Sequence, residues 1–272
     1  MTHILRDKVS GLILDMDGVL YRGTQPLPGA RQLFPALREA GLAFILLTNN
    51  ATLTAEEYTA RLGKMGIVVP PEAILTTAGA TATYLQQNYP QGGGIYVLGE
   101  PPLVRTLGNL PNFRLDGWNP DFVVVGLYYK FDYDSLQRAC SAIRRGARFI
   151  ATNTDATLPV EGGEVWPGAG SIVAAVKTCA GVEPVVIGKP STYMAELALS
   201  RIGLPPEQVL CVGDRLETDI LMGARAGMLT ALVLTGVSTR EDIEKAPARP
   251  DYVFDDLPDL MRALNIGSGG QV

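Results

Sequence analysis

Short apolar runs alternate with amphipathic segments along almost the whole chain. The runs are rich in Val, Ile and Leu and predict buried strands, whereas apolar positions three and four residues apart predict helices between them. Strands separated by helices form βαβ units, so we expect an α/β fold built on a Rossmann-like, doubly wound parallel sheet. Strands are expected at 11–15, 42–47, 94–98, 121–127, 148–152, 184–187, 208–212, 229–234 and 252–254. Helices are expected at 29–40, 54–64, 78–88, 101–108, 133–145, 169–180, 191–202, 217–226, 239–245 and 256–264.

Four of these strands run directly into polar or charged residues. Their apolar runs read "GLIL", "FILL", "PVVI" and "VLCV". The polar residues that follow them are Asp15 and Asp17, Thr48 and Asn49, Lys189, and Asp214 with Asp219. Open parallel sheets bind their ligands at the carboxyl ends of the strands, so we expect these side chains to converge on one edge.

The middle of the chain repeats the α/β alternation on its own. The segment "YPQGGG" at 89–94 is typical of a linker, and none of the four polar strand ends lies in the block that follows it. The simplest interpretation is a core domain interrupted by a second α/β domain. We therefore predict a core formed by residues 1–78 and 183–272, with an inserted domain at 79–182.

Composition excludes several classes of protein. Apolar residues make up 47 % of the 272 residues, enough for a sizeable core, and the formal charge is −5. No basic run suggests a nucleic-acid partner, and no apolar stretch reaches the roughly 20 residues needed to cross a membrane. The N-terminus lacks the long apolar segment of a secretory signal, so the cytoplasm is the expected compartment.

Histidine and cysteine are too sparse for several kinds of site. His3 is the single histidine, so a Ser-His-Asp triad, a Cys-His pair and a histidine-rich metal site are not expected. Cys140, Cys179 and Cys211 are far apart in the sequence without a CxxC pair, which indicates packing residues rather than a disulfide framework or a zinc cluster. Any acid, base or nucleophile must come from carboxylates, Lys, Tyr, Thr or a metal.

Two carboxylates end the first strand one residue apart. A hairpin turn at Asp17 and Gly18 is one alternative, but the following sequence offers no matching return strand. A calcium loop starting at Asp15 is another, but it would need oxygen ligands at Val19 and Pro26. A divalent cation that offsets the repulsion between the two acids explains them better.

The other strand ends have ordinary alternatives when each is taken alone. Thr48 could cap a helix, Lys189 could be a solvated side chain, and Asp219 fits the first turn of a helix. Capping does not explain Asp214 at the end of an apolar strand. Together the set gives acids, a hydroxyl and one amine, which suits a phosphate dianion bound to Mg²⁺.

In this order the motifs resemble those of the haloacid dehalogenase (HAD) superfamily of phosphotransferases. "DMDGVLYRG" is similar to its first motif, "LLTNNA" to the second, "IGKP" to the third and "GDRLETDI" to the fourth. The segment "ATNTDATLPVEGGEVWPGAGSIVAAV" is similar to the cap of the NagD-like, p-nitrophenyl phosphatase and phosphoglycolate phosphatase group. The resemblance covers nearly the whole chain and implies a Mg²⁺-dependent phosphatase with an inserted α/β cap.

It also implies roles for single residues. Asp15 is the implied nucleophile, which forms an aspartyl-phosphate, and Asp17 is the implied general acid and then base. Asp15, Asp214 and the backbone carbonyl of Asp17 are the implied Mg²⁺ ligands, and Asp219 holds water molecules of the metal. Thr48 and Asn49 are implied to bind phosphoryl oxygens, and Lys189 to balance charge.

One segment departs from the family pattern. After Gly126 and Leu127 the group usually has an acid, but this chain has Tyr128, and Lys130 follows. Contact of these residues with the substrate would favour an anionic or ring-bearing leaving group, and the sequence leaves that open. A homodimer through the cap also stays open.

The favoured function is hydrolysis of small phosphate monoesters of the phosphoglycolate, sugar phosphate, nucleotide or p-nitrophenyl phosphate type. A phosphomutase is the alternative among enzymes, and release of inorganic phosphate separates the two. A regulatory phospho-acceptor or a Mg²⁺-binding module would turn over no ester.

Overall fold

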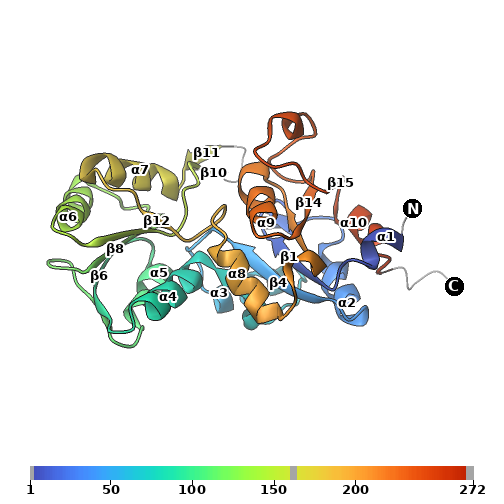
Figure 1. Ribbon diagram of the computed structural model, residues 1–272, viewed down its shortest axis with the longest axis horizontal. Helices are drawn as coiled ribbons and strands as arrows, with labels where there is room; N and C mark the ends of the chain where they lie inside the picture. Colours follow the sequence, from blue (N-terminus) through green and yellow to red (C-terminus); the bar gives the residue numbers. More distant parts are fainter. Residues whose placement is uncertain (1–2, 160–163, 268–272) are drawn as a thin grey trace. The chain divides into compact units, whose positions relative to one another are not determined.

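The computed structural model describes residues 3–159 and 164–267. The chain divides into two compact units. The core unit comprises Met1–Thr48, Ala55–Leu75 and Lys189–Val272, and the inserted unit comprises Asn49–Thr54 and Thr76–Gly188. In Figure 1 the core unit is coloured at both ends of the scale, blue and orange to red, whereas the inserted unit is mainly green to yellow.

A six-stranded sheet forms the centre of the core unit. Its strand order is β15-β14-β13-β1-β4-β5, and the pairs β1·β4, β1·β13, β13·β14 and β14·β15 are parallel. The strands are β1 (Gly11–Asp15), β4 (Ala43–Thr48), β5 (Ile74–Thr76), β13 (Val209–Gly213), β14 (Leu229–Val233) and β15 (Tyr252–Phe254). β4 and β5 extend the sheet to one side of β1, and β13, β14 and β15 extend it to the other side, which is the doubly wound order.

The register aligns the carboxyl ends of the central strands. Asp15 pairs with Leu47 of β4, and Leu14 pairs with Val212 of β13. The strand order reverses between β1 and β13, and a crevice forms outside the strand ends at such a point in doubly wound sheets. Residues that follow β1, β4 and β13 are therefore positioned next to one another.

Helices and short turns complete the core unit. Its helices are α1 (His3–Arg6), α2 (Ala30–Glu39), α3 (Ala55–Lys64), α8 (Tyr193–Ile202), α9 (Leu221–Arg225) and α10 (Leu257–Ala263). A π-helical turn, η3 (Leu216–Ile220), precedes α9, and short 3₁₀ turns occupy Pro71–Ala73, Pro206–Gln208 and Glu241–Lys245. The expected helices at 217–226 and 239–245 are thus a π-helical turn with a short helix and a 3₁₀ turn.

The inserted unit has a five-stranded sheet of its own. Its order is β12-β9-β8-β6-β7, and the pairs β12·β9, β9·β8, β8·β6 and β6·β7 are parallel. Its strands are β6 (Gly93–Leu98), β7 (Phe113–Leu115), β8 (Phe122–Val125), β9 (Arg148–Ala151) and β12 (Val185–Val186). A separate pair, β10 (Thr157–Pro159) and β11 (Val165–Pro167), is antiparallel. The helices of the inserted unit are α4 (Thr77–Asn88), α5 (Pro101–Gly108), α6 (Tyr133–Arg144) and α7 (Ala169–Ala180). Two such sheets agree with the predicted α/β fold with an inserted α/β domain.

The strand that precedes Lys189 belongs to a different sheet from the one we expected. Val185 pairs with Ile150 of β9, so β12 is an edge strand of the inserted sheet and not a strand of the core sheet. The prediction of four polar ends on one sheet is therefore wrong for this strand. A short apolar run carries no information about which of two parallel sheets it joins. The core unit accordingly resumes at Lys189, six residues after the expected position 183.

No described strand returns from Asp17 along β1, as the sequence indicated: β1 pairs with β4 and β13, whereas the short strands β2 (Tyr21–Arg22) and β3 (Gln25–Pro26) pair antiparallel with each other. One smaller expectation differs from the structure. Cys140 and Cys211 are buried as expected of packing residues, but Cys179 is exposed. Among the described residues we find no helix with the length and apolar character needed to span a membrane.

Candidate active site

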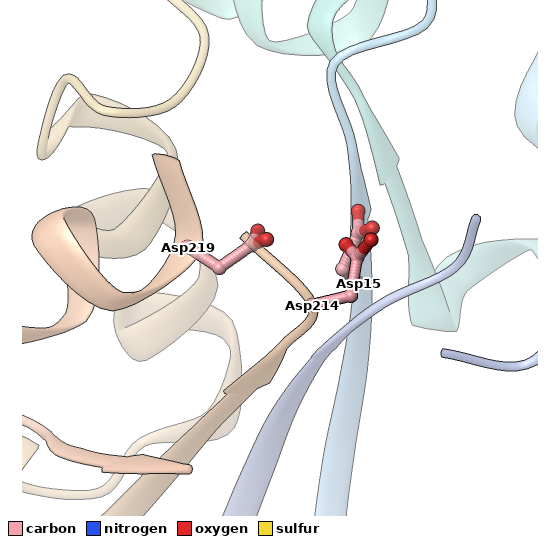
Figure 2. Close-up of side chains that lie close together, drawn as sticks. All are labelled: Asp15, Asp214 and Asp219. Carbon is pink, nitrogen blue, oxygen red and sulfur yellow. The ribbon is translucent and has the colours of Figure 1, made fainter. Parts of the chain in front are cut away.

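Three carboxylates meet at the carboxyl end of the core sheet. Asp15 ends β1, Asp214 directly follows β13, and Asp219 lies on η3. One oxygen from each lies within 4.8 Å of the others. Figure 2 shows the side chain of Asp219 directed toward those of Asp15 and Asp214. The structure therefore brings together acids that are about two hundred residues apart in the sequence.

Glycines make room for this cluster. A Cβ atom on Gly213 would lie 2.1 Å from the Cβ of Asp219, and one on Gly236 would lie 1.9 Å from Asp214 Oδ2. Both distances are far below van der Waals contact. The backbone N–H of Val237 donates to Asp214 Oδ2 at 2.8 Å, which fixes that carboxyl group. The loop after β14 thus encloses Asp214, and no larger residue fits at either glycine.

Lys189 is the positive side chain of the cluster. Its Nζ donates to Asp15 Oδ1 at 2.5 Å and to Asp219 Oδ1 at 2.6 Å. The side chains of Lys189 and Asp219 are only 5 % and 2 % exposed, so water screens this interaction very little. The sequence interpretation placed Lys189 beside the acids, and the structure confirms that position even though β12 belongs to the other sheet.

Burial and mutual repulsion control the ionisation of the acids. Burial raises the pKa of Asp15 well above its ordinary value; Lys189 opposes the rise, whereas Asp219 and Asp214 add to it. Burial is the largest cause that raises the pKa of Asp214 to about 6, and the negative charge of Asp219 is the next largest. Burial by itself would lower the pKa of Lys189, but Asp15 and Asp219 outweigh it and raise the pKa. The cluster holds more negative charge than one lysine offsets.

The donor set fits a hard divalent cation. Asp214 Oδ1 is buried and has no hydrogen-bond partner among the described residues. A buried carboxylate oxygen without a partner is costly, and a metal ion would remove that cost. Three carboxylates are the oxygen ligands that Mg²⁺ prefers, and no thiol or imidazole belongs to the cluster. The acidic cluster is therefore compatible with a Mg²⁺ site.

Stabilisation by Mg²⁺ should increase with pH. The pKa of Asp214 is raised to about 6 in the folded state, from an ordinary value of 3.8. The stability that this proton contributes is fully present below the ordinary value and is lost as the pH rises through about 6. The metal-free protein is then left with a buried charge that Mg²⁺ can bind. Thermal unfolding with and without MgCl₂, between about pH 5 and pH 7.5, measures the difference in Tm.

Asp214→Asn is the matched variant for this prediction. It removes the charge with little change in size, and we expect it to abolish most of the Mg²⁺-dependent shift at every pH. A wild-type shift that stays constant across this range would contradict the assignment of the metal to this cluster.

Asp17 lies beside a tyrosine and an arginine. Tyr21 Oη donates to Asp17 Oδ2 at 3.1 Å, and the Arg61 guanidinium lies 4.9 Å from the centre of the Tyr21 ring. The Asp17 side chain is exposed, yet the protein around its carboxyl group displaces enough water to raise its pKa. Arg61 and the hydrogen bond from Tyr21 oppose that rise. The side chain of Asp17 is not part of the three-carboxylate cluster.

Thr48 and Asn49 lie on opposite sides of a unit boundary. Thr48 is the last residue of β4 and is buried in the core unit. Asn49, the next residue, belongs to the inserted unit, where its Nδ2 donates to both carboxylate oxygens of Asp155 at 3.2 and 3.0 Å. The Asn49 side chain is therefore engaged within the inserted unit.

The sequence interpretation missed two residues: Arg61, which lies near Asp17 in the core unit, and Asp155, which accepts from the Asn49 amide in the inserted unit. Arg61 lies in the last turn of α3, where a basic residue on an amphipathic helix normally faces solvent. Asp155 comes shortly after the expected strand 148–152, so a search of every strand end, including those of the inserted domain, could have found it. Tyr128 packs partly buried against the core of the inserted unit, and Lys130 is exposed.

Comparisons with known proteins find relatives over most of the chain. A family model described as haloacid dehalogenase-like hydrolase matches residues 12–110, and one described as HAD-hydrolase-like matches residues 186–260. A dihydroxyacetone phosphatase of Corynebacterium glutamicum is 38 % identical over 91 % of this chain and 89 % of its own length.

Solved structures are similar to this chain in fold. A 4-nitrophenylphosphatase of Thermotoga maritima superposes with a TM-score of 0.90 at 37 % identity, covering 96 % of this chain and 99 % of its own. A glycerol phosphate phosphatase of Mycobacterium tuberculosis, solved in complex with magnesium, gives a TM-score of 0.86 at 34 % identity. This match covers 94 % of the present chain and 77 % of that one.

Proposed function

Since the chain belongs to the haloacid dehalogenase-like hydrolases and is a phosphatase of that family, we propose that it hydrolyses small phosphate monoesters with Mg²⁺ through an aspartyl-phosphate on Asp15. The observation that carries the proposal is the buried cluster of Asp15, Asp214 and Asp219 around Lys189. An enzyme with a carboxylate nucleophile replaces one difficult displacement at phosphorus by two easier ones.

Asp15 and Asp17 carry the chemistry in this proposal. An oxygen of Asp15 attacks phosphorus, and the bond between phosphorus and the ester oxygen breaks. Asp17 gives its proton to the leaving alcohol, for which a raised pKa is favourable. Asp17 then takes a proton from the water molecule that hydrolyses the aspartyl-phosphate. Asp15 is regenerated, and inorganic phosphate leaves.

The remaining residues hold charge and position. Asp15, Asp214 and the backbone carbonyl of Asp17 would hold the cation, with Asp219 holding its water molecules. When bound, Mg²⁺ supplies positive charge that offsets the carboxylates and the charge on the transferred phosphoryl group. Lys189 favours the ionised form of Asp15 and offers positive charge to the transferred phosphoryl group. Thr48 and Asn49 bind phosphoryl oxygens, Asn49 through its backbone N–H because its side-chain amide donates to Asp155.

Small phosphate esters are the proposed substrates. The relatives described above are named for dihydroxyacetone, 4-nitrophenyl and glycerol phosphate, which share a single phosphate on a small leaving group. Because the alcohol parts of these esters differ, we expect the active site to bind mainly the phosphoryl group and to contact the alcohol less closely. We therefore expect activity on several members of this class.

A phosphate-release screen tests the proposal. The purified chain is incubated with p-nitrophenyl phosphate, glycerol phosphate, dihydroxyacetone phosphate, phosphoglycolate and a nucleoside monophosphate, with MgCl₂ or with EDTA. We expect inorganic phosphate from more than one ester in MgCl₂ and a loss of at least about 100-fold in EDTA, because the cation's charge is then missing. Turnover without release of phosphate would indicate a phosphomutase instead.

A further inference from the structure

The carbonyl oxygen of Asn49 accepts two buried hydrogen bonds from the inserted unit. Thr77 Oγ1 donates to it at 2.8 Å, and Asn153 Nδ2 donates to it at 2.7 Å. Asn49, Thr77 and Asn153 are 8 %, 0 % and 5 % exposed. A carbonyl oxygen has two lone pairs, so this pair of donors can satisfy both of them.

A closed ring of hydrogen bonds surrounds the same carbonyl. The backbone N–H of Asp155 donates to Asn153 Oδ1 at 3.1 Å, and the carboxylate of Asp155 accepts from Asn49 Nδ2. Each member is therefore held by the next: Asn49 by Asp155, Asp155 by Asn153, and Asn153 by Asn49. Such a network fixes a backbone segment more strictly than any single bond does.

The hydroxyl of Thr77 is not needed by its own helix. Thr76 is the N-cap of α4, and its side chain accepts from Gly79 N at 3.1 Å. Thr81, one turn further, makes the ordinary bond of a helical threonine, from its Oγ1 to the carbonyl of Thr77 at 2.7 Å. Thr77 instead donates out of the helix to Asn49. Its bond thus serves the segment that contains Asn49.

Chain connectivity links this network to the proposed phosphate-binding residues. Thr48 and Asn49 share a peptide bond, as do Gly188 and Lys189, and both bonds are unit boundaries. Gly188 packs closely within the inserted unit: a Cβ on it would lie 2.6 Å from Asn49 Oδ1 and 2.9 Å from Thr77 Cγ2. The network therefore fixes the residues next to Thr48 and next to Lys189.

We propose that Thr77 and Asn153 are positioning residues, whose hydrogen bonds to the Asn49 carbonyl hold the segment that directly follows Thr48 and thereby keep Thr48 in its phosphate-binding geometry. The inference rests on the proposed function and extends it to residues of the inserted unit. A displacement of about 1 Å at a phosphoryl-binding group is enough to lower the rate strongly.

The test compares Thr77→Val with Thr81→Val. Both changes remove a fully buried hydroxyl from the same helix and leave a carbonyl without that donor, so their effects on Tm should be alike. Only Thr77→Val should lower kcat for p-nitrophenyl phosphate, by about 10-fold, and weaken the binding of inorganic phosphate by a similar factor. Thr77→Ser keeps the donor and should restore both values.

Two further measurements secure the result. Asn153→Ala removes the other donor to the same carbonyl and should reproduce the loss even if Thr77→Val folds poorly. Calorimetry with inorganic phosphate measures binding independently of any ester. Equal kinetics for Thr77→Val and Thr81→Val, with an active wild type, would overturn the inference alone. A wild-type protein that neither hydrolyses esters nor binds phosphate would overturn the proposed function and the inference with it.

Discussion

Asp15→Asn should abolish turnover while the fold persists. The amide has the same shape as the carboxylate but cannot form a stable acyl-phosphate, and we expect kcat to fall by at least about 10⁴-fold, as when other catalytic nucleophiles are removed. The fold should survive because the variant removes one of three mutually repelling buried charges, while Lys189 keeps its bond to Asp219. Phosphate release and circular dichroism measure the two effects.

Asp7→Asn is the matched control, because Asp7 is an exposed acid of the same unit. It should leave both kcat and Tm at the wild-type values. Burst experiments with the wild type should also trap a phosphoryl group on the protein, and Asp15→Asn should trap none. Wild-type activity of Asp15→Asn in MgCl₂ would show that another group attacks phosphorus.

The meeting of Asp15 with Asp214 could be predicted because it depends on a general property of parallel sheets. Both residues follow apolar runs, and the carboxyl ends of neighbouring parallel strands lie at one edge. The prediction does not depend on the paths of the connections between the strands. It needed only the expectation that β1 and β13 belong to the same sheet, which the doubly wound pattern supplied.

The strand before Lys189 could not be assigned to its sheet from the sequence. The position of Lys189 beside Asp15 was predicted from a strand end, but the strand belongs to the inserted sheet. Lys189 lies three residues after the end of β12, at the point where the chain re-enters the core unit, and there it contacts the acids. The need for a cation beside three buried acids predicts the position of Lys189 correctly. The assignment of the preceding strand to the core sheet is wrong and was not needed for that prediction.

Asn49 and Arg61 show what a sequence pattern cannot specify. The partner of the Asn49 amide, Asp155, is 106 residues away in another strand-end turn, and only the packing of the inserted unit selects it. Arg61 is a helical basic residue like several others, and its contact with Tyr21 depends on how α3 packs. Neither the pairing of Asn49 with Asp155 nor the contact of Arg61 with Tyr21 can be predicted from local propensity or periodicity.

Lys189→Met should cost far more stability than any surface lysine. The unbranched side chain of Met fills similar space, but it leaves the carboxylates of Asp15 and Asp219 buried without their cation. Removing one partner of a buried ion pair lowers the free energy of unfolding by about 3–5 kcal/mol. Asp15 and Asp219 raise the pKa of Lys189, so its contribution is fully present below the ordinary lysine value and is lost only at alkaline pH.

The pH dependence of the variant follows from the remaining acids. Without Lys189, Asp15 and Asp219 repel each other, and protonation of Asp15, whose pKa burial already raises, relieves that repulsion at lower pH. The loss of stability should therefore be largest near neutral pH and shrink toward about pH 5. We also expect kcat to fall by about 10²-fold or more, because the charge on the transferred phosphoryl group loses a preorganised cation.

Lys177→Met supplies the comparison. Lys177 also makes an ion pair, with Glu183 at 2.8 Å, but the two side chains are 49 % and 75 % exposed. Exposed pairs contribute at most about 1 kcal/mol, so this variant should unfold almost like the wild type and keep its activity. Urea unfolding at two pH values, with the phosphate-release assay, measures both variants. If Lys189→Met lost no more stability than Lys177→Met, the buried lysine would not be what holds the acidic cluster together.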